Sequence, residues 1–302
     1  MMNIGQLRVL DALERERSFS KAASFLGISQ PAVSMQMRKL QGTHGVKLFW
    51  RHGKAVQFST IGKDLVLKAR KVISIVDDIE SILDSASQLK KGSLSVGMSC
   101  NYLVMEVLAA FMNRYPEIQV KARVDDSMNL LDEVLACRLD IAEITGSLPD
   151  PRVHCSLYGN QEIVLFVGRG HEWAGTQSLQ IPALHDQRMV ALHPTSMTRQ
   201  IFMARLKTFG VVPDIVLELD SWETLRDAVV EGIGFGIALE DEYTTDERLF
   251  KIRIDGTDMR ASQYFICLPE FRRLRTVSAF FDLLESVRPS TPEGNHPSAV
   301  YP

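Results

Sequence analysis

Residues 19–34 read FSKAASFLGISQPAVS, and this stretch decides the fold of the first part of the chain. Ala23 is small enough to let two helices cross closely, and Gly27 can adopt the positive φ that ends a helix in a sharp turn. Ser29 can cap the next helix, and Pro31 falls in its first turn, where a missing N–H costs nothing. Val33 then fills the space between the helices. These are the steric requirements of a helix-turn-helix.

The flanking residues complete a small domain over residues 1–58. Leu7, Leu10 and Leu13 recur at three-residue spacing with polar residues between them, which predicts an amphipathic first helix. After the motif, residues 45–54 and 56–59 are two short apolar-alternating runs around a basic, glycine-containing tip. Together these patterns predict a winged helix-turn-helix that binds double-stranded DNA.

The outward face of the second motif helix carries side chains suited to DNA. Gln can read a base edge, Ser can contact a base or a phosphate, and Arg and Lys neutralise phosphates. The candidate DNA-binding residues are Gln30, Pro31, Ser34, Gln36, Arg38 and Lys39 on the helix, with Arg51 and Lys54 on the wing. The alternative is an all-helical subdomain with a polar face.

The charge distribution favours the DNA interpretation. Residues 1–92 contain fifteen Lys or Arg and eight Asp or Glu residues, a net charge of +7, whereas the rest of the chain carries −10. A basic segment joined to an acidic body indicates that only the first part meets a polyanion.

A long linker helix is predicted over residues 59–91. The run has no proline, and no glycine between Gly62 and Gly92, so it gives a rod of roughly 45–50 Å at ~1.5 Å per residue. Apolar residues step alternately by four and three, which is a heptad seam and predicts self-association. The seam residues are Leu65, Ala69, Val72, Val76, Ile79 and Leu83. The alternative is that this helix packs on the body of its own chain.

From residue 92 to 288, short apolar strands alternate with helices, which predicts βαβ units and a mostly parallel sheet. A second unit begins near residue 163. The tail, residues 289–302, has four prolines and little apolar content and is expected to be disordered.

Ligands in such sheets settle beyond the carboxyl ends of strands, where helix N-termini offer free N–H groups. Hydroxyl, amide and guanidinium groups at three such positions predict a site for a small anion, although each serine or threonine alone could be only a cap. The candidates are Ser99, Asn101, Ser196, Thr198, Arg199, Ser221 and Glu223.

The composition and motifs exclude several classes of protein. With 45% hydrophobic and 24% charged residues, the chain is typical of a water-soluble protein of about two domains, and no apolar run nears the ~18 residues of a membrane span. No catalytic motif, cofactor fingerprint or metal-ligand spacing is present, so neither an enzyme nor a cofactor is expected. The N-terminus lacks a secretion signal, which favours the cytoplasm and reduced thiols.

The chain resembles the LysR-type transcriptional regulators. The resemblance is most specific in residues 19–34, quoted above, in the stretch GVKLF at residues 45–49 and in Arg51, and it extends from residue 3 to about 288. The family's opening of the linker helix is altered here to Phe58-Ser59-Thr60-Ile61-Gly62, in which Ser59 keeps a capping hydroxyl.

The resemblance implies a winged helix-turn-helix, a linker helix that pairs antiparallel between subunits, and a two-lobed effector domain like a type 2 periplasmic binding protein. The chain would cross between the lobes twice, with lobe one at about 92–162 and 267–288 and lobe two at about 163–266. Family members are commonly dimers or tetramers of identical subunits, and the effector changes the DNA bend.

Residues 196–202 and 225–240 look most like regulators associated with aminoethylphosphonate catabolism. Arg199 and the helix N-termini would then hold the phosphonate, and Glu223 its amine. The alternative function is a metabolite-binding enzyme or solute receptor with the same two-lobed fold, which would have no use for the basic segment.

Overall fold

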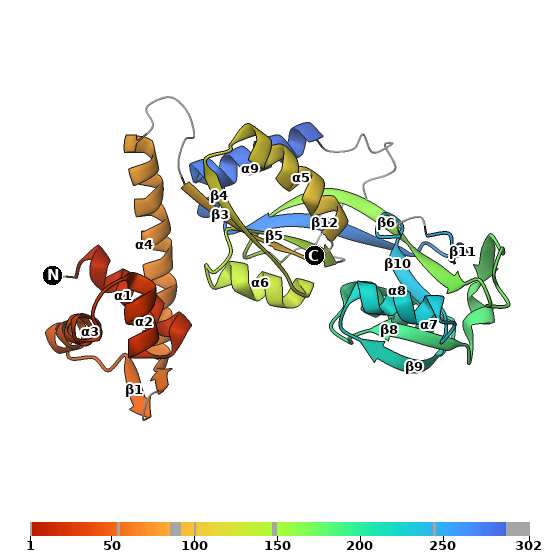
Figure 1. The fold of residues 1–302 in the computed structure, drawn as a ribbon, viewed down its shortest axis with the longest axis horizontal. Coiled ribbons are helices and arrows are strands. Elements are labelled where there is room, and N and C mark those ends of the chain that lie inside the picture. The colour runs from red at the N-terminus through yellow and green to blue at the C-terminus, as the bar shows by residue number, and fades with distance from the viewer. Residues whose placement is uncertain are drawn as a thin grey trace, which may run out of the picture.

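The structure is a computed structural model that describes residues 2–52, 55–84, 92–99, 101–146, 150–243 and 246–287. The predicted tail, residues 289–302, lies outside these ranges. A head of helices and one hairpin is followed by the linker helix α4 and a body of two lobes (Figure 1). The elements of the head and linker are α1 (Ile4–Glu16), α2 (Phe19–Leu26), α3 (Gln30–His44), β1 (Phe49–His52), β2 (Ala55–Phe58) and α4 (Thr60–Asp84).

The head has the predicted helix-turn-helix and wing. Gly27 ends α2 with a φ of 65°, and the Ser29 side chain accepts a hydrogen bond from the N–H of Ala32 at 3.4 Å. Val33 is fully buried in a core that it shares with Leu10 and Leu13 of α1. β1 and β2 pair antiparallel beside these helices.

The junction between the wing and α4 leaves no room for a side chain at Gly62. A Cβ placed there would lie 2.0 Å from the carbonyl oxygen of Leu48. Ser59 fixes the junction, because its Oγ accepts from the Gly62 N–H and donates to the Leu48 carbonyl, both at 3.0 Å.

The linker helix is apolar on two faces, and this corrects the predicted seam. Ala69 is only 1% exposed because it packs into the head's own core, and Leu65 is partly buried there. Val76 is half-buried, and the side chain of Leu83 lies outside the described residues. The exposed apolar stripe, between 43% and 59% exposed, consists of Ile61, Val72, Ile75 and Ile79. Val72 and Ile79 of the predicted seam lie on this stripe, whereas Ala69 is buried within its own chain, so the heptad pattern alone did not separate the two faces.

The elements of the body alternate between strands and helices. They are β3 (Gly92–Met98), α5 (Asn101–Arg114), β4 (Ile118–Val124), α6 (Ser127–Leu135), β5 (Ile141–Gly146), β6 (His154–Gly168), β7 (Ser178–Gln180), β8 (Arg188–Leu192), α7 (Met197–Thr208), β9 (Asp214–Leu219), α8 (Trp222–Val230), β10 (Gly236–Leu239), β11 (Leu249–Asp255), β12 (Arg260–Cys267) and α9 (Arg275–Val287). Two short 3₁₀ turns, Ile181–Leu184 and Phe271–Arg273, complete the set in these ranges.

The main sheet is mixed and not mostly parallel. Its strand order is β4-β3-β5-β12-β6-β11-β7, with β10 also paired to β6. β3, β4 and β5 run parallel, as do β8 and β9, but β12 is antiparallel to both of its neighbours. The difference arises because the fifteen-residue β6 and the strand β12 carry the chain between the two lobes in opposite directions.

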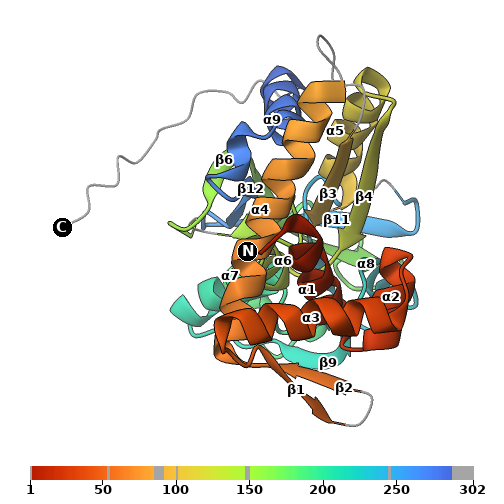
Figure 2. The same ribbon diagram turned by 90° about the vertical axis from the view of Figure 1, so that its left-hand side faces the viewer.

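Each lobe has its own core. Lobe one is built around buried residues from 94–158 and 265–284, and lobe two around residues from 163–261. Figure 2 shows α4 running in front of lobe one, with α3 across its lower part and the hairpin of β1 and β2 below α3.

We expect Gly62→Ala to destabilise the head by about 1–3 kcal/mol, because the new methyl group must displace the backbone at Leu48. The matched control is Gly42→Ala in α3, where nothing lies within 4 Å of the added Cβ. Helix propensity predicts that this change stabilises by up to about 1 kcal/mol. Urea unfolding of the full chain measures both, and equal effects at the two positions would contradict the close approach.

Candidate DNA interface and effector cleft

The outer face of α3 presents most of the predicted DNA-binding residues. Gln30, Pro31, Arg38 and Lys39 are exposed, and Ser34 is half-buried. Gln36 differs from the prediction, because its Oε1 is buried near Gly5 of α1, without a hydrogen-bond partner among the described residues. Residues 30, 31, 34, 38 and 39 therefore remain available to a DNA groove.

Arg51 on β1 is held next to α3. Its guanidinium lies over the ring of Phe19, 3.7 Å from the centroid, and its Nη2 donates to Ser34 Oγ at 3.3 Å. Stacking fixes the plane of the guanidinium, so less side-chain entropy is lost when it meets a phosphate. Lys54 at the wing tip lies outside the described residues.

A polar cluster lies at the carboxyl ends of β3 and β5 in lobe one. The N–H and Oγ of Ser99 donate to Glu143 Oε2 at 2.8 and 3.0 Å, and Ser99 Oγ lies 3.3 Å from Thr145 Oγ1. Ser127 starts α6, and its Oγ accepts from the Thr145 N–H at 3.0 Å. The N-termini of α5 and α6 thus open at this edge, where Asn101 begins α5 although its side chain is not described.

Two glutamines join the lobes where the long strands cross. Gln161 Nε2 donates to Gln263 Oε1 at 2.6 Å, and Gln161 Oε1 accepts from the N–H of Asp241 at 3.0 Å. Gln263 is fully buried, and its Nε2 has no partner among the described residues. A buried donor without a partner is costly, so this amide is a candidate ligand contact.

The N-termini of α7 and α8 form the edge of lobe two. They follow the parallel strands β8 and β9, and the N–H of His193 donates to the Leu219 carbonyl at 2.9 Å across them. Ser196 and Ser221 cap these helices, accepting from the N–H groups of Arg199 at 3.4 Å and Thr224 at 3.3 Å. The capping role that the sequence left open is therefore the one observed.

Arg199 is already paired within the protein, which argues against its predicted contact with an anion. Its Nη1 donates to the Leu192 carbonyl at 2.5 Å and to Glu218 Oε2 at 3.0 Å, and its side chain is only 11% exposed. The hydrogen bond from Arg199 holds the pKa of Glu218 below its ordinary value. Arg199 therefore links β8 to β9. The remaining candidate effector-binding residues at this edge are Thr198, which is half-buried, and Glu223, which is exposed.

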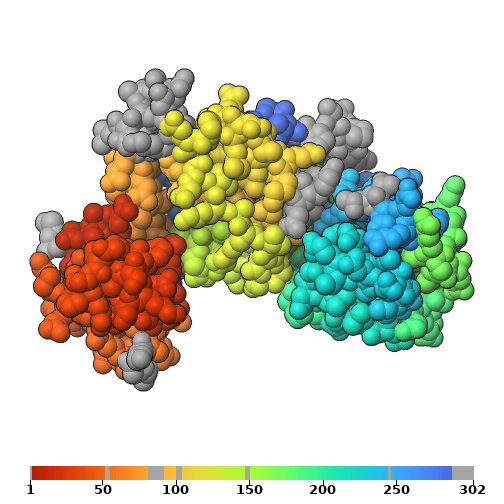
Figure 3. Space-filling model, viewed as in Figure 1, coloured from red at the N-terminus to blue at the C-terminus, as the bar shows by residue number. Residues whose placement is uncertain are grey.

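The two edges belong to one interlobe region. α7 of lobe two packs against β5 and β12, and the surface is hollowed between α6 of lobe one and the helices of lobe two (Figure 3). Sequence reasoning found Ser99 but missed Ser127, Glu143, Thr145, Gln161 and Gln263. Glu143 stands between Ala142 and Ile144 in a buried strand, and a carboxylate in that position was the available signal.

The three described cysteines are buried or partly buried. Burial raises the pKa of Cys137 and Cys155 to about 11 and that of Cys267 to about 12. Such thiols are protonated at neutral pH, and the thiolate is the reactive form. Cys100 is outside the described residues, within which no group of three His, Cys, Asp or Glu side chains could hold a metal and no helix is long and apolar enough to cross a membrane.

Comparison with known families assigns both parts of the chain. Residues 4–63 match "Bacterial regulatory helix-turn-helix protein, lysR family", and residues 87–288 match "LysR substrate binding domain". The chain therefore belongs to the LysR family of transcriptional regulators and is not an enzyme. A probable RuBisCO transcriptional regulator of Emiliania huxleyi is 29% identical over 241 residues, which cover 76% of each chain.

Solved structures show the same fold. A full-length OxyR variant of Pseudomonas aeruginosa has a TM-score of 0.76 at 20% identity, covering 94% of this chain and 95% of its own. CbnR in complex with its target DNA has a TM-score of 0.65 at 18% identity, covering 94% and 99%. The CcmR regulatory domain of Synechocystis PCC6803 in complex with 2-PG has a TM-score of 0.62 at 20% identity, covering 67% and 100%.

Proposed function

We propose that α3 reads the major groove of an operator and that Arg51 holds the head in register on the backbone. The observation that carries the proposal is the stacked Arg51 guanidinium, aligned beside the exposed polar face of α3. Gln30 supplies a base-edge contact, whereas Arg38, Lys39 and Arg51 supply charge. We propose the cytoplasm as its location, because a regulator of transcription must reach the DNA that it controls.

The experiment is a gel shift on DNA from upstream of the chain's own gene, at several salt concentrations. We expect Gln30→Ala to weaken the cognate site by about 1–3 kcal/mol and to relax preference at one base pair. Arg51→Ala should weaken all DNA about equally and flatten the salt dependence. The roles are wrong if the two variants have the same salt slope and the same sequence preference.

We propose that the interlobe region binds a small anion. The N-termini of α6, α7 and α8 present a partial positive charge there, with the hydroxyls of Ser99 and Thr145 nearby. CcmR, whose regulatory domain has this fold, is bound to 2-PG in its structure. Because Glu218 neutralises Arg199, hydroxyls and backbone N–H groups are the proposed partners of a phosphate or phosphonate. Aminoethylphosphonate is the specific candidate.

Thermal unfolding tests the effector site with 2-PG, aminoethylphosphonate and inorganic phosphate as probes. A ligand at a hundredfold excess over its Kd stabilises the folded chain by about 2.7 kcal/mol, which raises the melting temperature by several degrees. We expect Thr145→Val to abolish the rise, because it removes a hydroxyl of the cluster at nearly constant volume. Thr208→Val at the exposed end of α7 is the control. A rise that survives Thr145→Val would move the site elsewhere.

We propose that the chain self-associates, as a homodimer or homotetramer, through the exposed stripe of α4. Ile75 lies at the centre of this stripe and is 48% exposed. Ile75→Asp would place an unpaired charge in a desolvated seam, so we expect the oligomer to dissociate. Lys63→Asp, on the same helix but off the stripe, should leave the oligomer intact. Sedimentation velocity measures both, and an unchanged oligomer in Ile75→Asp would contradict the proposal.

A further inference from the structure

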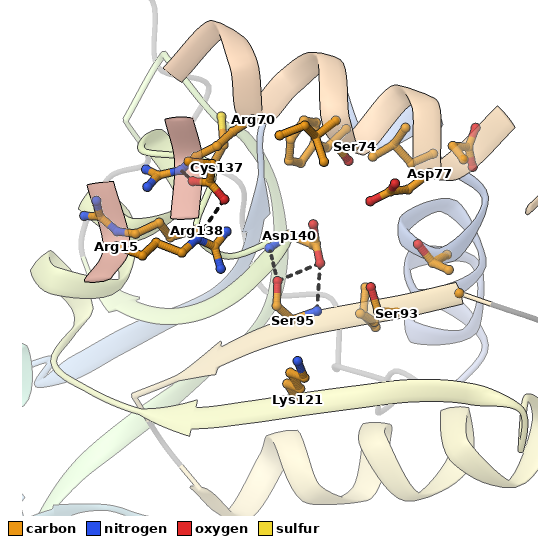
Figure 4. A pocket seen from close by; sticks show the side chains of 18 residues that line it. Arg15, Arg70, Ser74, Asp77, Ser93, Ser95, Lys121, Cys137, Arg138 and Asp140 are labelled. Atoms are coloured by element: carbon orange, nitrogen blue, oxygen red, sulfur yellow. Dashed lines mark hydrogen bonds and ion pairs between the residues drawn. The ribbon is translucent and has the colours of Figure 1, made fainter. Parts of the chain in front are cut away.

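Several hydrogen bonds and ion pairs between described residues tie the linker helix to lobe one. Arg70 Nη1 donates to the Ala136 carbonyl at 2.9 Å, Lys71 Nζ pairs with Glu270 at 2.9 Å, and the N–H of Arg275 donates to Asp78 at 2.9 Å. Between them lies a cavity of about 230 Å³, bounded by α1, α4 and β3 (Figure 4). Because this joint is partly hollow, a shift of lobe one is not resisted there by close packing.

Arg70 is the most buried of these tethers. Its side chain is 3% exposed, and it lies between two carboxylates of α1, with Nε 2.5 Å from Asp11 Oδ1 and Nη2 2.6 Å from Glu14 Oε2. A guanidinium held by two buried carboxylates has a fixed orientation. The two carboxylates of the head therefore also set the direction of the third contact of Arg70, which is made to lobe one.

That third contact ends a helix of the effector domain. The last carbonyls of α6 have no partner within the helix and carry the negative end of its dipole. α6 ends at Leu135, and Cys137 turns the chain away with a φ of 52°, which leaves the Ala136 carbonyl facing Arg70. Arg70 thus caps α6 from another domain.

The opposite end of α6 lies in the interlobe region. Ser127, its first residue, accepts from the N–H of Thr145, which in turn lies beside Ser99. The helix has nine residues, so it spans about 13 Å at ~1.5 Å per residue. A displacement of its first turn is carried to the Ala136 carbonyl with little loss, because the helix is hydrogen-bonded throughout.

On the head side, the network reaches the wing. Glu14 pairs with Arg17 as well as with Arg70. The Arg17 carbonyl accepts a hydrogen bond from the N–H of Val56 on β2 at 3.0 Å. The guanidinium of Arg17 lies 5.8 Å from the centroid of the Phe58 ring. A continuous series of contacts through α6, Arg70 and Glu14 therefore joins Ser127 to the hairpin beside α3.

We propose that Arg70 is the positioning residue that couples the effector cleft to the DNA-binding head, with α6 as the rigid element between them. The proposal rests on the proposed function, because it assigns a route to regulation by the cleft. A ligand that moves the first turn of α6 changes the Ala136–Arg70 contact. Glu14 and Arg17 pass this change to the wing.

Hydrogen exchange of the full chain, followed by mass spectrometry without DNA or ligand, tests this coupling. Ser127→Ala loosens the cleft end of α6, and we expect amides of residues 4–16 and 55–58 to exchange about threefold faster, within the range of measured couplings. In an Arg70→Lys background, Ser127→Ala should add nothing further, since three separate nitrogens of the guanidinium make the three contacts and a single ammonium nitrogen does not reproduce that spread. Glu14→Gln should uncouple the wing in the same way, should Arg70→Lys fail to fold.

Two controls make the result specific. Arg8→Gln breaks the exposed 2.7 Å pair of α1 with Asp77 of α4, without touching lobe one, and should leave the Ser127→Ala effect intact. Ser286→Ala on α9 should leave exchange in the head unchanged. Equal effects of Ser127→Ala with and without Arg70, or no effect on the head, would overturn the proposal. Thermal unfolding with ligand judges the effector cleft separately, and the gel shift judges operator binding separately, because neither measurement depends on this coupling.

Discussion

Two buried carboxylates on the first helix require a cation, and Arg70 of the linker helix supplies it. Asp11 and Glu14 are each less than 10% exposed, and a carboxylate in that environment is tolerated only when it is paired and hydrogen-bonded. Arg15 and Arg17 pair with the same carboxylates from their exposed sides. This network fixes the head on its linker, and through the Ala136 carbonyl it fixes both on lobe one.

In the body, the described polar groups gather where strands end and helices begin, and not in a buried ion-pair network. Parallel strands in both lobes are followed by the N-termini of α5 to α8, of which α6 is capped by Asp126 and α7 and α8 are capped by Ser196 and Ser221. β6 and β12, which cross between the lobes, carry the paired glutamines at the junction. The region therefore combines fixed partial charges with hydroxyl groups on elements that can move relative to each other.

Much of the fold follows from local sequence, and the predictions that the structure changed have physical causes. Gly27, Ser29 and Pro31 act only on their neighbours, so the helix-turn-helix could be predicted directly from the sequence. The phase of the linker seam depends on where α1 packs, which places Ala69 inside the head. Likewise, the ion pair between Arg199 and Glu218 spans two strands, and no local pattern shows that the arginine is already occupied.

The buried network and its link to α6 join residues 56 to 66 positions apart, so neither could be predicted from local sequence.

The central claim, that the head recognises a specific operator, is tested most directly by fluorescence anisotropy with two duplexes of equal length and composition. One carries the sequence upstream of the chain's gene, and the other a scrambled order. At physiological salt the account predicts that the upstream duplex binds at least about 10³-fold more tightly. Equal affinity for the two duplexes would contradict it.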